Sequence, residues 1–246
     1  MIEVHALMTE QSAIPSNDSR GRLLGEASGF LVTMGFAMAV RGTREKNRST
    51  IAIGVTVQIA GDLSRGLHIL IDAGNYYAAV VLGRQLLEAT QLIRYFRAAP
   101  ARAEFWLTAT DADMRKAPDF KPAALRRTTH ANDRMYDTHC LLGGHPRSMA
   151  RLLLPGSLWR KPGDVCSLPR TDGTSVEADL KAFLLTDALQ HIYETVLAAL
   201  EVLDLDALQV LGVLEDNAVE RTSELVKNLV AWRDNDPLSS VGSIGT

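Results

Sequence analysis

"NYYAAVVLGRQLLEATQLIRYFRA", residues Asn75–Ala98, is the stretch that indicates the fold most clearly. On a helical wheel of about 100° per residue, its apolar side chains gather on one broad face. That face holds Leu82, Leu86, Ala89, Ile93 and Phe96. A narrow polar stripe lies apart from it and holds Arg84, Glu88, Gln91 and Tyr95. Because apolar residues also flank this stripe on both sides, we expect it to be partly buried and its charges to need partners.

The same three- and four-residue spacing of apolar side chains continues through most of the chain after residue 20. Sustained alternation of apolar and polar residues, which is typical of strands, does not occur. The predicted fold class is therefore all-α, an antiparallel helical bundle of six or seven helices. The predicted helices are Ser19–Val40, Thr50–Ala73, Tyr76–Ala98, Ala101–Lys116, Pro122–Leu142, Val176–Leu203 and Ala207–Arg233.

Helix ends are marked by residues with known capping preferences. Ser49 or Thr50 is the expected N-cap of the second helix. Gly74 is expected to end that helix and Asn75 to cap the next, which predicts a tight antiparallel hairpin. Pro100 marks the start of another helix, where its missing N–H costs nothing.

The domain organisation follows from composition along the chain. Residues 19–233 are predicted to form a single helical domain, preceded by an N-terminal extension over residues 1–18. Residues 154–175 read "LPGSLWRKPGDVCSLPRTDGTS" and are expected to form a long loop, either a functional lid or a disordered insertion. Residues 234–246 are expected to be a disordered tail.

Overall composition bounds the class of protein. The chain has 246 residues, 46% of them hydrophobic, which is enough for a sizeable core. A net charge of −3 argues against broad electrostatic coating of nucleic acid. Cys140 and Cys166 are too few for a disulfide framework. The N-terminus lacks a secretory pattern, and Phe30–Val40 is too short to span a bilayer. We expect a soluble, cytoplasmic protein with no membrane partner.

The polar stripe of Asn75–Ala98 is the first candidate site. Arg84 and Glu88 stand four residues apart, so they face each other on a helix. They form either an ordinary ion pair on a solvated edge or the lining of a cleft between helices.

The second candidate site is "ANDRMYDTHCLLGGHPRSMA", residues 131–150. Tyr136 and His139 share a helix face, whereas Arg134 points elsewhere. The following Gly-Gly pair breaks the helix, and Pro146 keeps His145 extended. The segment is either a simple helix stop or a place where histidine moves protons and arginine stabilises an anionic phosphorane, which suits phosphodiester cleavage without a metal ion.

Several known site types are missing from the sequence. No Glu is followed by His three residues later, as a ferritin-like metal bundle requires. The HExxH, GxSxG, GxGxxG and P-loop motifs are also absent. His191 is expected to be half-buried or on the surface. A metal site could otherwise draw only on residues without an established ligand spacing, namely His130, Asp133, Asp137 and Glu88. No metal ion and no other cofactor are therefore expected.

Three segments resemble a group of uncharacterised bacterial all-α proteins. "VLGRQLLEATQLIRYF" resembles that group's Arg-x-x-x-Glu helix, and "FWLTATDADMRK" and "CLLGGHP" resemble its later helices and its His-Pro segment. The likeness covers about residues 50–150 and points to His145. The group is more distantly similar to the HEPN superfamily of small helical bundles. "RMYDTH" has the spacing of the HEPN Arg-to-His motif and points to Arg134 and His139, although Met135 replaces the usual polar residue.

The resemblance implies a homodimeric, HEPN-like endoribonuclease that needs no metal ion, of a toxin-antitoxin or phage-defence system, with RNA and an antitoxin or defence protein as partners. Arg134, His139 and His145 would be catalytic, whereas Arg84, Glu88 and Tyr136 would bind or orient the substrate. The alternative is a non-enzymatic regulatory or scaffold module that binds a small anion, a nucleotide or a protein partner in the polar cleft.

Overall fold

The computed structural model describes residues 16–129, 133–144, 153, 176–210 and 214–236. Over these residues the ordered elements are all helical, which confirms the all-α class. Five helices are long: α1 (Asn17–Arg44), α2 (Arg48–Asp72), α3 (Tyr76–Ala98), α8 (Val176–Leu200) and α10 (Ala218–Asn235). The shorter ones are α4 (Pro100–Thr108), α5 (Asp111–Lys116), α6 (Pro122–Thr129), α7 (Asp133–His139) and α9 (Leu205–Val210), with a 3-10 turn at Pro118–Phe120 and a π turn at Cys140–Gly144.

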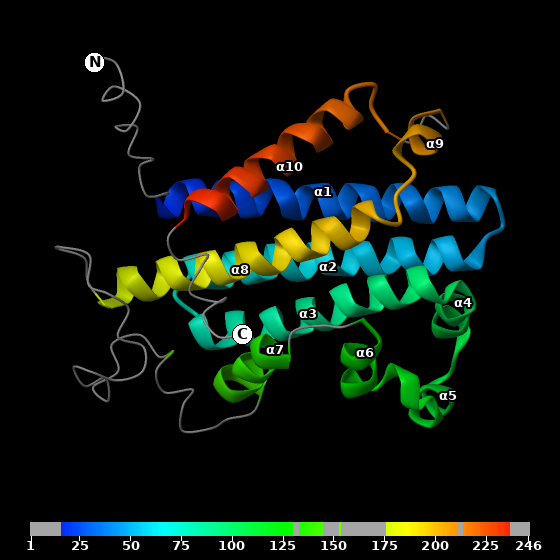
Figure 1. Ribbon diagram of the computed structural model, residues 1–246, viewed down its shortest axis with the longest axis horizontal. Helices are drawn as coiled ribbons and strands as arrows, with labels where there is room; N and C mark the ends of the chain where they lie inside the picture. The colour runs from blue at the N-terminus through cyan, green and yellow to red at the C-terminus, as the bar shows by residue number, and fades with distance from the viewer. Residues whose placement is uncertain (1–15, 130–132, 145–152, 154–175, 211–213, 237–246) are drawn as a thin grey trace, which may run out of the picture.

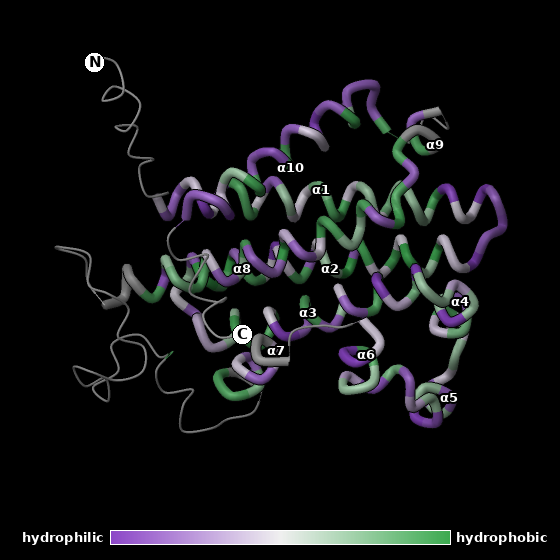
Figure 2. Tube along the Cα trace, in the orientation of Figure 1, coloured by the Kyte–Doolittle hydropathy of each residue, from purple (hydrophilic) through white to green (hydrophobic). Residues whose placement is uncertain are grey.

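The long helices form a bundle around one core. In Figure 1, α1, α2, α3 and α8 lie alongside one another, α10 crosses over α1, and α4 to α7 form an outer row beside α3. Figure 2 shows hydrophobic and hydrophilic residues interspersed along the long helices, as expected for helices with one face in the core. Most of the largest fully buried side chains come from these same helices, among them Leu24, Ile71, Phe96 and Leu189.

Glycine sets the distance between α1 and α2. A Cβ added to Gly35 would collide with the backbone nitrogen of Gln58, and one added to Gly54 would lie 2.6 Å from the nitrogen of Ala39. Gly61 meets Val32 in the same way at 2.7 Å. The two backbones therefore touch along most of their length, which side chains at these positions would prevent.

Two of the predicted caps are confirmed and one is wrong. The Asn75 side chain accepts a hydrogen bond from the Ala78 backbone N–H at 3.3 Å, directly after Gly74 with φ of +72°. Pro100 is at the start of α4. The N-cap of α2, however, is Asn47, whose side chain accepts from the Thr50 N–H at 3.1 Å, so the helix begins earlier than Ser49 or Thr50.

Three predicted helices are interrupted. The predicted helix over residues 101–116 breaks at Ala109, which is extended, because Thr110 and Asp113 form a capping box that starts α5. The one over 122–142 is divided into α6, α7 and the π turn, and residues 130–132 lie outside the described part of the chain. The one over 207–233 is divided into α9 and α10.

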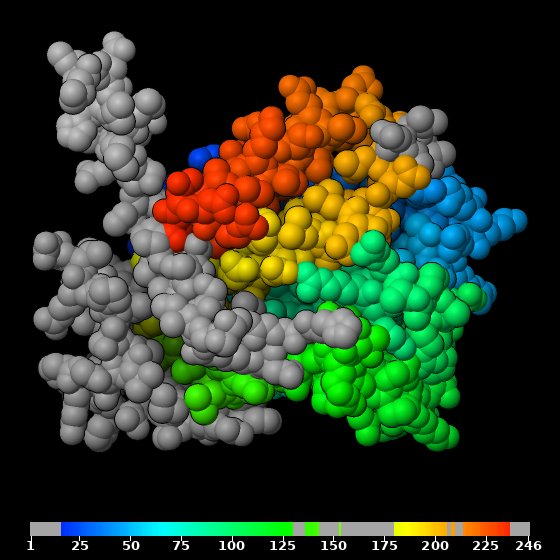
Figure 3. Space-filling model, in the orientation of Figure 1, coloured from blue at the N-terminus to red at the C-terminus, as the bar shows by residue number. Residues whose placement is uncertain are grey.

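The C-terminal end of α10 is fixed to the bundle by a buried carboxylate. Asp236 accepts hydrogen bonds from Arg20 of α1, at 2.7 Å to Nε and 3.0 Å to Nη2. It also accepts from Trp232 at 2.9 Å and from Thr186 of α8 at 3.3 Å. In the space-filling view of Figure 3, α8 is visible between α10 and α3. One residue thus joins α1, α8 and α10.

In the part of the chain that the structure describes, one helix, α1, is long and apolar enough to cross a membrane by length and composition. The prediction that Phe30–Val40 is too short to span a bilayer considered only part of this helix, which is apolar over a longer window. Half of that apolar window is buried inside the bundle. This pattern is compatible with the core helix of a soluble protein.

Candidate functional site

Two histidines and an aspartate meet where α7, α3 and α8 come together. His139 is the last residue of α7, and Asp187 and His191 stand four residues apart on α8. The Nε2 atoms of the two histidines are 2.7 Å apart. One carboxylate oxygen of Asp187 lies 3.2 Å from Nε2 of His139 and 3.4 Å from Nε2 of His191. We call these three residues the His–Asp–His cluster.

The backbone of α3 orients His139. Nδ1 of His139 lies 3.1 Å from the carbonyl oxygen of Val80. Since a carbonyl only accepts, Nδ1 must carry a proton, and Nε2 is then the ring nitrogen that faces the cluster. Gly83 makes room for the ring, because a Cβ there would lie 2.8 Å from its Cε1 atom. The sequence around Val80 and Gly83 therefore sets both the position and the tautomer of His139.

The cluster is buried but open on the side of its carboxylate. The side chains of His139 and His191 are 4% and 0% exposed, whereas that of Asp187 is 27% exposed. Nδ1 of His191 is buried without a hydrogen-bond partner among the described residues. A small molecule or ion would therefore reach the cluster past Asp187.

The close contacts within the cluster shift the pKa values of Asp187 and His139. Burial raises the pKa of Asp187, but the two imidazoles outweigh it and hold that pKa well below its usual range. Burial lowers the pKa of His139, but the Asp187 carboxylate outweighs this and the pKa ends above its ordinary value. The cluster therefore holds an ionised carboxylate and attracts a positive charge.

The polar stripe of α3 forms a separate cluster next to this one. Arg84 donates to Glu88 at 3.1 Å, and the Tyr136 hydroxyl donates to the same carboxylate oxygen at 2.9 Å. The guanidinium carbon atoms of Arg84 and Arg126 lie 5.2 and 4.0 Å from the centre of the Tyr136 ring. The expected partial burial of the stripe is confirmed, since the Arg84 and Glu88 side chains are 27% and 30% exposed.

The structure brings some of the predicted site residues together and separates others. Arg84, Glu88 and Tyr136 meet, but His139 faces Val80 and α8 instead of Glu88. Arg134 belongs to α7, but its side chain is not described, and His145 lies outside the described residues.

Sequence reasoning missed Asp187 and misjudged His191. The prediction that His191 is half-buried or on the surface is wrong, because it is fully buried. Asp187 and His191 form an Asp-x-x-x-His pair on one helix face, which was the available signal. Of the residues considered for a metal site, Glu88 is engaged by Arg84 and Tyr136, Asp137 is exposed, and His130 lies outside the described residues.

Comparison with known proteins adds no relative: no protein-family model, no curated protein and no solved structure matches this chain.

Proposed function

We propose that this chain is a metal-binding helical protein in which His139, Asp187 and His191 hold one divalent transition-metal ion. The observation that carries the proposal is the convergence of two imidazole nitrogens and a carboxylate oxygen, all within 4.8 Å of one another, from helices about 50 residues apart in sequence.

The chemistry of these ligands favours a borderline metal ion. Imidazole nitrogens suit Zn²⁺, Fe²⁺, Ni²⁺ and Cu²⁺, whereas Mg²⁺ and Ca²⁺ prefer sites made of oxygen alone. The hydrogen bond from Nδ1 of His139 to Val80 is of the kind that orients metal-binding histidines. Two imidazoles and one carboxylate are therefore a suitable set for zinc or iron(II).

Three protein ligands leave coordination positions for water or a substrate. Catalytic zinc sites and the two-His-one-carboxylate iron sites both use three protein ligands in this way. The partly exposed Asp187 lies on the side from which such a molecule would enter. A metal ion here would supply a Lewis acid or an activated water molecule.

A metal titration tests this proposal. Chelator-treated protein is titrated with Zn²⁺, Fe²⁺ and Mg²⁺ while the bound metal is counted by mass spectrometry and unfolding is followed by calorimetry. We expect one Zn²⁺ or Fe²⁺ per chain, a melting temperature that rises with metal concentration, and much weaker binding of Mg²⁺. Asp187→Asn is expected to lower affinity at least about tenfold, because it removes the anionic ligand. Gly83→Ala should have a similar effect by displacing the His139 ring.

A histidine–aspartate pair on α2 provides a matched control for the metal titration. His68 and Asp72 are also a histidine and an aspartate four residues apart on one helix, with Nε2 and Oδ2 3.3 Å apart, but they are no part of the cluster. Asp72→Asn should leave metal binding unchanged. The proposal fails if the wild type binds no transition metal more tightly than Mg²⁺, or if Asp187→Asn and Asp72→Asn bind alike while circular dichroism shows both to be folded.

RNA cleavage without a metal ion is the second proposal, within an antiparallel HEPN-like bundle that acts as a homodimer alongside an antitoxin or defence partner. The meeting of Arg84, Glu88 and Tyr136 supports it, since those residues were expected to orient RNA. It ranks lower because His139 is 4% exposed and both of its ring nitrogens have partners. Cleavage of total RNA that persists in EDTA and is lost in Arg134→Ala and His139→Ala would favour it over the metal site.

A further inference from the structure

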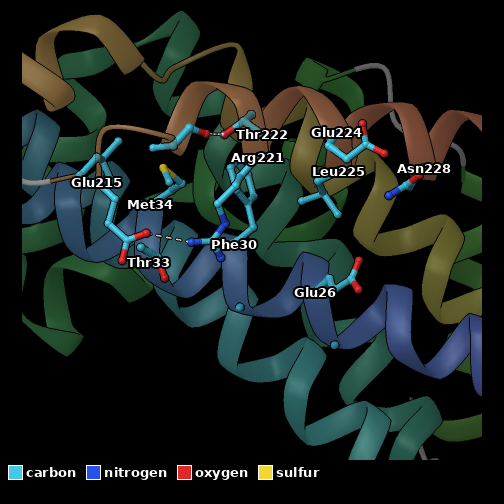
Figure 4. A pocket seen from close by; sticks show the side chains of 14 residues that line it. Glu26, Phe30, Thr33, Met34, Glu215, Arg221, Thr222, Glu224, Leu225 and Asn228 are labelled. Carbon is cyan, nitrogen blue, oxygen red and sulfur yellow. Dashed lines mark hydrogen bonds and ion pairs between the residues drawn. The ribbon is translucent and has the colours of Figure 1, made fainter.

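A cavity that shares no residue with the His–Asp–His cluster lies between α1 and α10. Its volume is about 820 Å³, within the usual range of small-molecule pockets. From its anchor at Asp236, α10 runs across α1, and the cavity lies beside the first half of α10, where side chains of both helices line it (Figures 1 and 4).

A missing side chain helps to keep this cavity open. Gly29 of α1 lines it, and a Cβ added there would meet no atom within 4 Å. This is unlike Gly35 on the same helix, where an added Cβ would collide with α2. Gly29 therefore borders open space and is not needed for helix packing.

The lining combines apolar surface with excess negative charge. Phe30, Met34 and Leu225 supply apolar side chains. Glu26 of α1 and Glu224 of α10 lie at one end of the cavity (Figure 4). At the other end, Glu215 accepts from Arg221 at 3.0 Å, so that pair is neutral.

The two carboxylates at this end, Glu26 and Glu224, differ in their ion-pair partners. Glu26 is paired with Arg22 of its own helix at 2.9 Å, on an exposed edge. Within the described part of the chain, Glu224 forms no ion pair. An apolar ligand with a positive charge would bury its body against Phe30 and Leu225 and place the charge near Glu224 and Glu26.

We propose that this α1–α10 cavity is a binding site for a small organic cation with an apolar body, such as a hydrophobic amine. The proposal does not depend on the metal site, because the two share no residue. The free carboxylate selects for charge, and the apolar walls supply most of the affinity.

The test compares two probes of the same shape, 2-naphthylmethylammonium and neutral 2-naphthalenemethanol, by calorimetry with the full chain. We expect the amine to bind with a dissociation constant on the order of 1 mM or tighter. We expect the alcohol to bind at least about threefold more weakly, with the difference shrinking at high salt. Absence of amine binding, or equal binding of both probes, would overturn the proposal.

Two variants locate the binding. Gly29→Leu fills the cavity and should weaken both probes at least about tenfold, while thermal unfolding confirms that the bundle still forms. Glu224→Gln should remove most of the preference for the amine and leave the affinity for the alcohol unchanged. Glu220→Gln, an exposed position on the same helix outside the cavity, is the matched control and should change neither. If Gly29→Leu folds and binds both probes as the wild type does, the probes bind elsewhere and the proposal is wrong.

Discussion

At the scale of single residues, two polar side chains of α7 belong to different clusters because they meet different partners. Tyr136 and His139 are three residues apart on α7, yet they reach different neighbours on α3. Tyr136 donates to the Glu88 side chain, whereas His139 donates to the Val80 backbone and meets α8. Two adjacent polar clusters thus arise from one short helix.

Tyr136 gives a prediction about pH. Burial, together with the Glu88 carboxylate that accepts its hydrogen bond, raises its pKa to about 12. In the unfolded chain the pKa is about 10, so the folded protein holds the proton more tightly. The resulting stability is fully present below pH 10 and is lost as the pH rises from about 10 to 12.

Tyr136→Phe tests this expectation. The variant should be less stable than the wild type by about 1 kcal/mol at neutral pH, since it loses one hydrogen bond to a charged group. Urea unfolding should show the difference shrinking above pH 10. A titration at 295 nm should lack one high-pH tyrosine in the variant. A difference in stability that grows between pH 10 and 12 would contradict a raised pKa for Tyr136 in the folded protein.

At the scale of helices, glycine has two opposite roles along α1. Gly35 allows the α1 and α2 backbones to touch, whereas Gly29 borders the cavity beside α10. Both lie within the helix, where glycine lowers helix stability by about 1 kcal/mol relative to alanine. Only at Gly35 is this cost offset by close packing.

Alanine at the two positions should therefore have opposite effects. Gly29→Ala should raise the free energy of unfolding by about 0.5–1 kcal/mol, because the new Cβ meets nothing and the unfolded chain loses freedom. Gly35→Ala should lower it by roughly 1–3 kcal/mol, because the Cβ would force apart two backbones. Chemical denaturation of both variants measures the signs. Destabilisation by both would mean that the cavity wall is packed.

At the scale of the whole molecule, a buried ion pair joins the end of α10 to α1. Arg20 and Asp236 are 216 residues apart, and their side chains are 3% and 0% exposed. Trp232 and Thr186 also donate hydrogen bonds to this carboxylate. This junction closes the bundle, since it joins α10 to both α1 and α8.

Removing the carboxylate should loosen that junction. Asp236→Ala is expected to cost about 3–5 kcal/mol of folding free energy, because it leaves the Arg20 guanidinium buried without its counter-charge. Asp234→Ala, which removes an exposed carboxylate paired with the neighbouring Arg233, should change stability by less than about 1 kcal/mol. Denaturant midpoints give both values. Equal effects of the two substitutions would show that the buried pair does not hold α10.

The sequence by itself determined the helical class, because the period of its apolar residues is a local property. The Asn75 cap and the partial burial of the Arg84–Glu88 stripe followed from the same local pattern. The break at Ala109 was missed, since the competition between one long helix and two shorter ones depends on what each half packs against. Only the tertiary structure decided the site. His139 and His191 are 52 residues apart in sequence. No local periodicity predicts that the His139 ring, packed over Gly83, meets both Asp187 and His191 of α8.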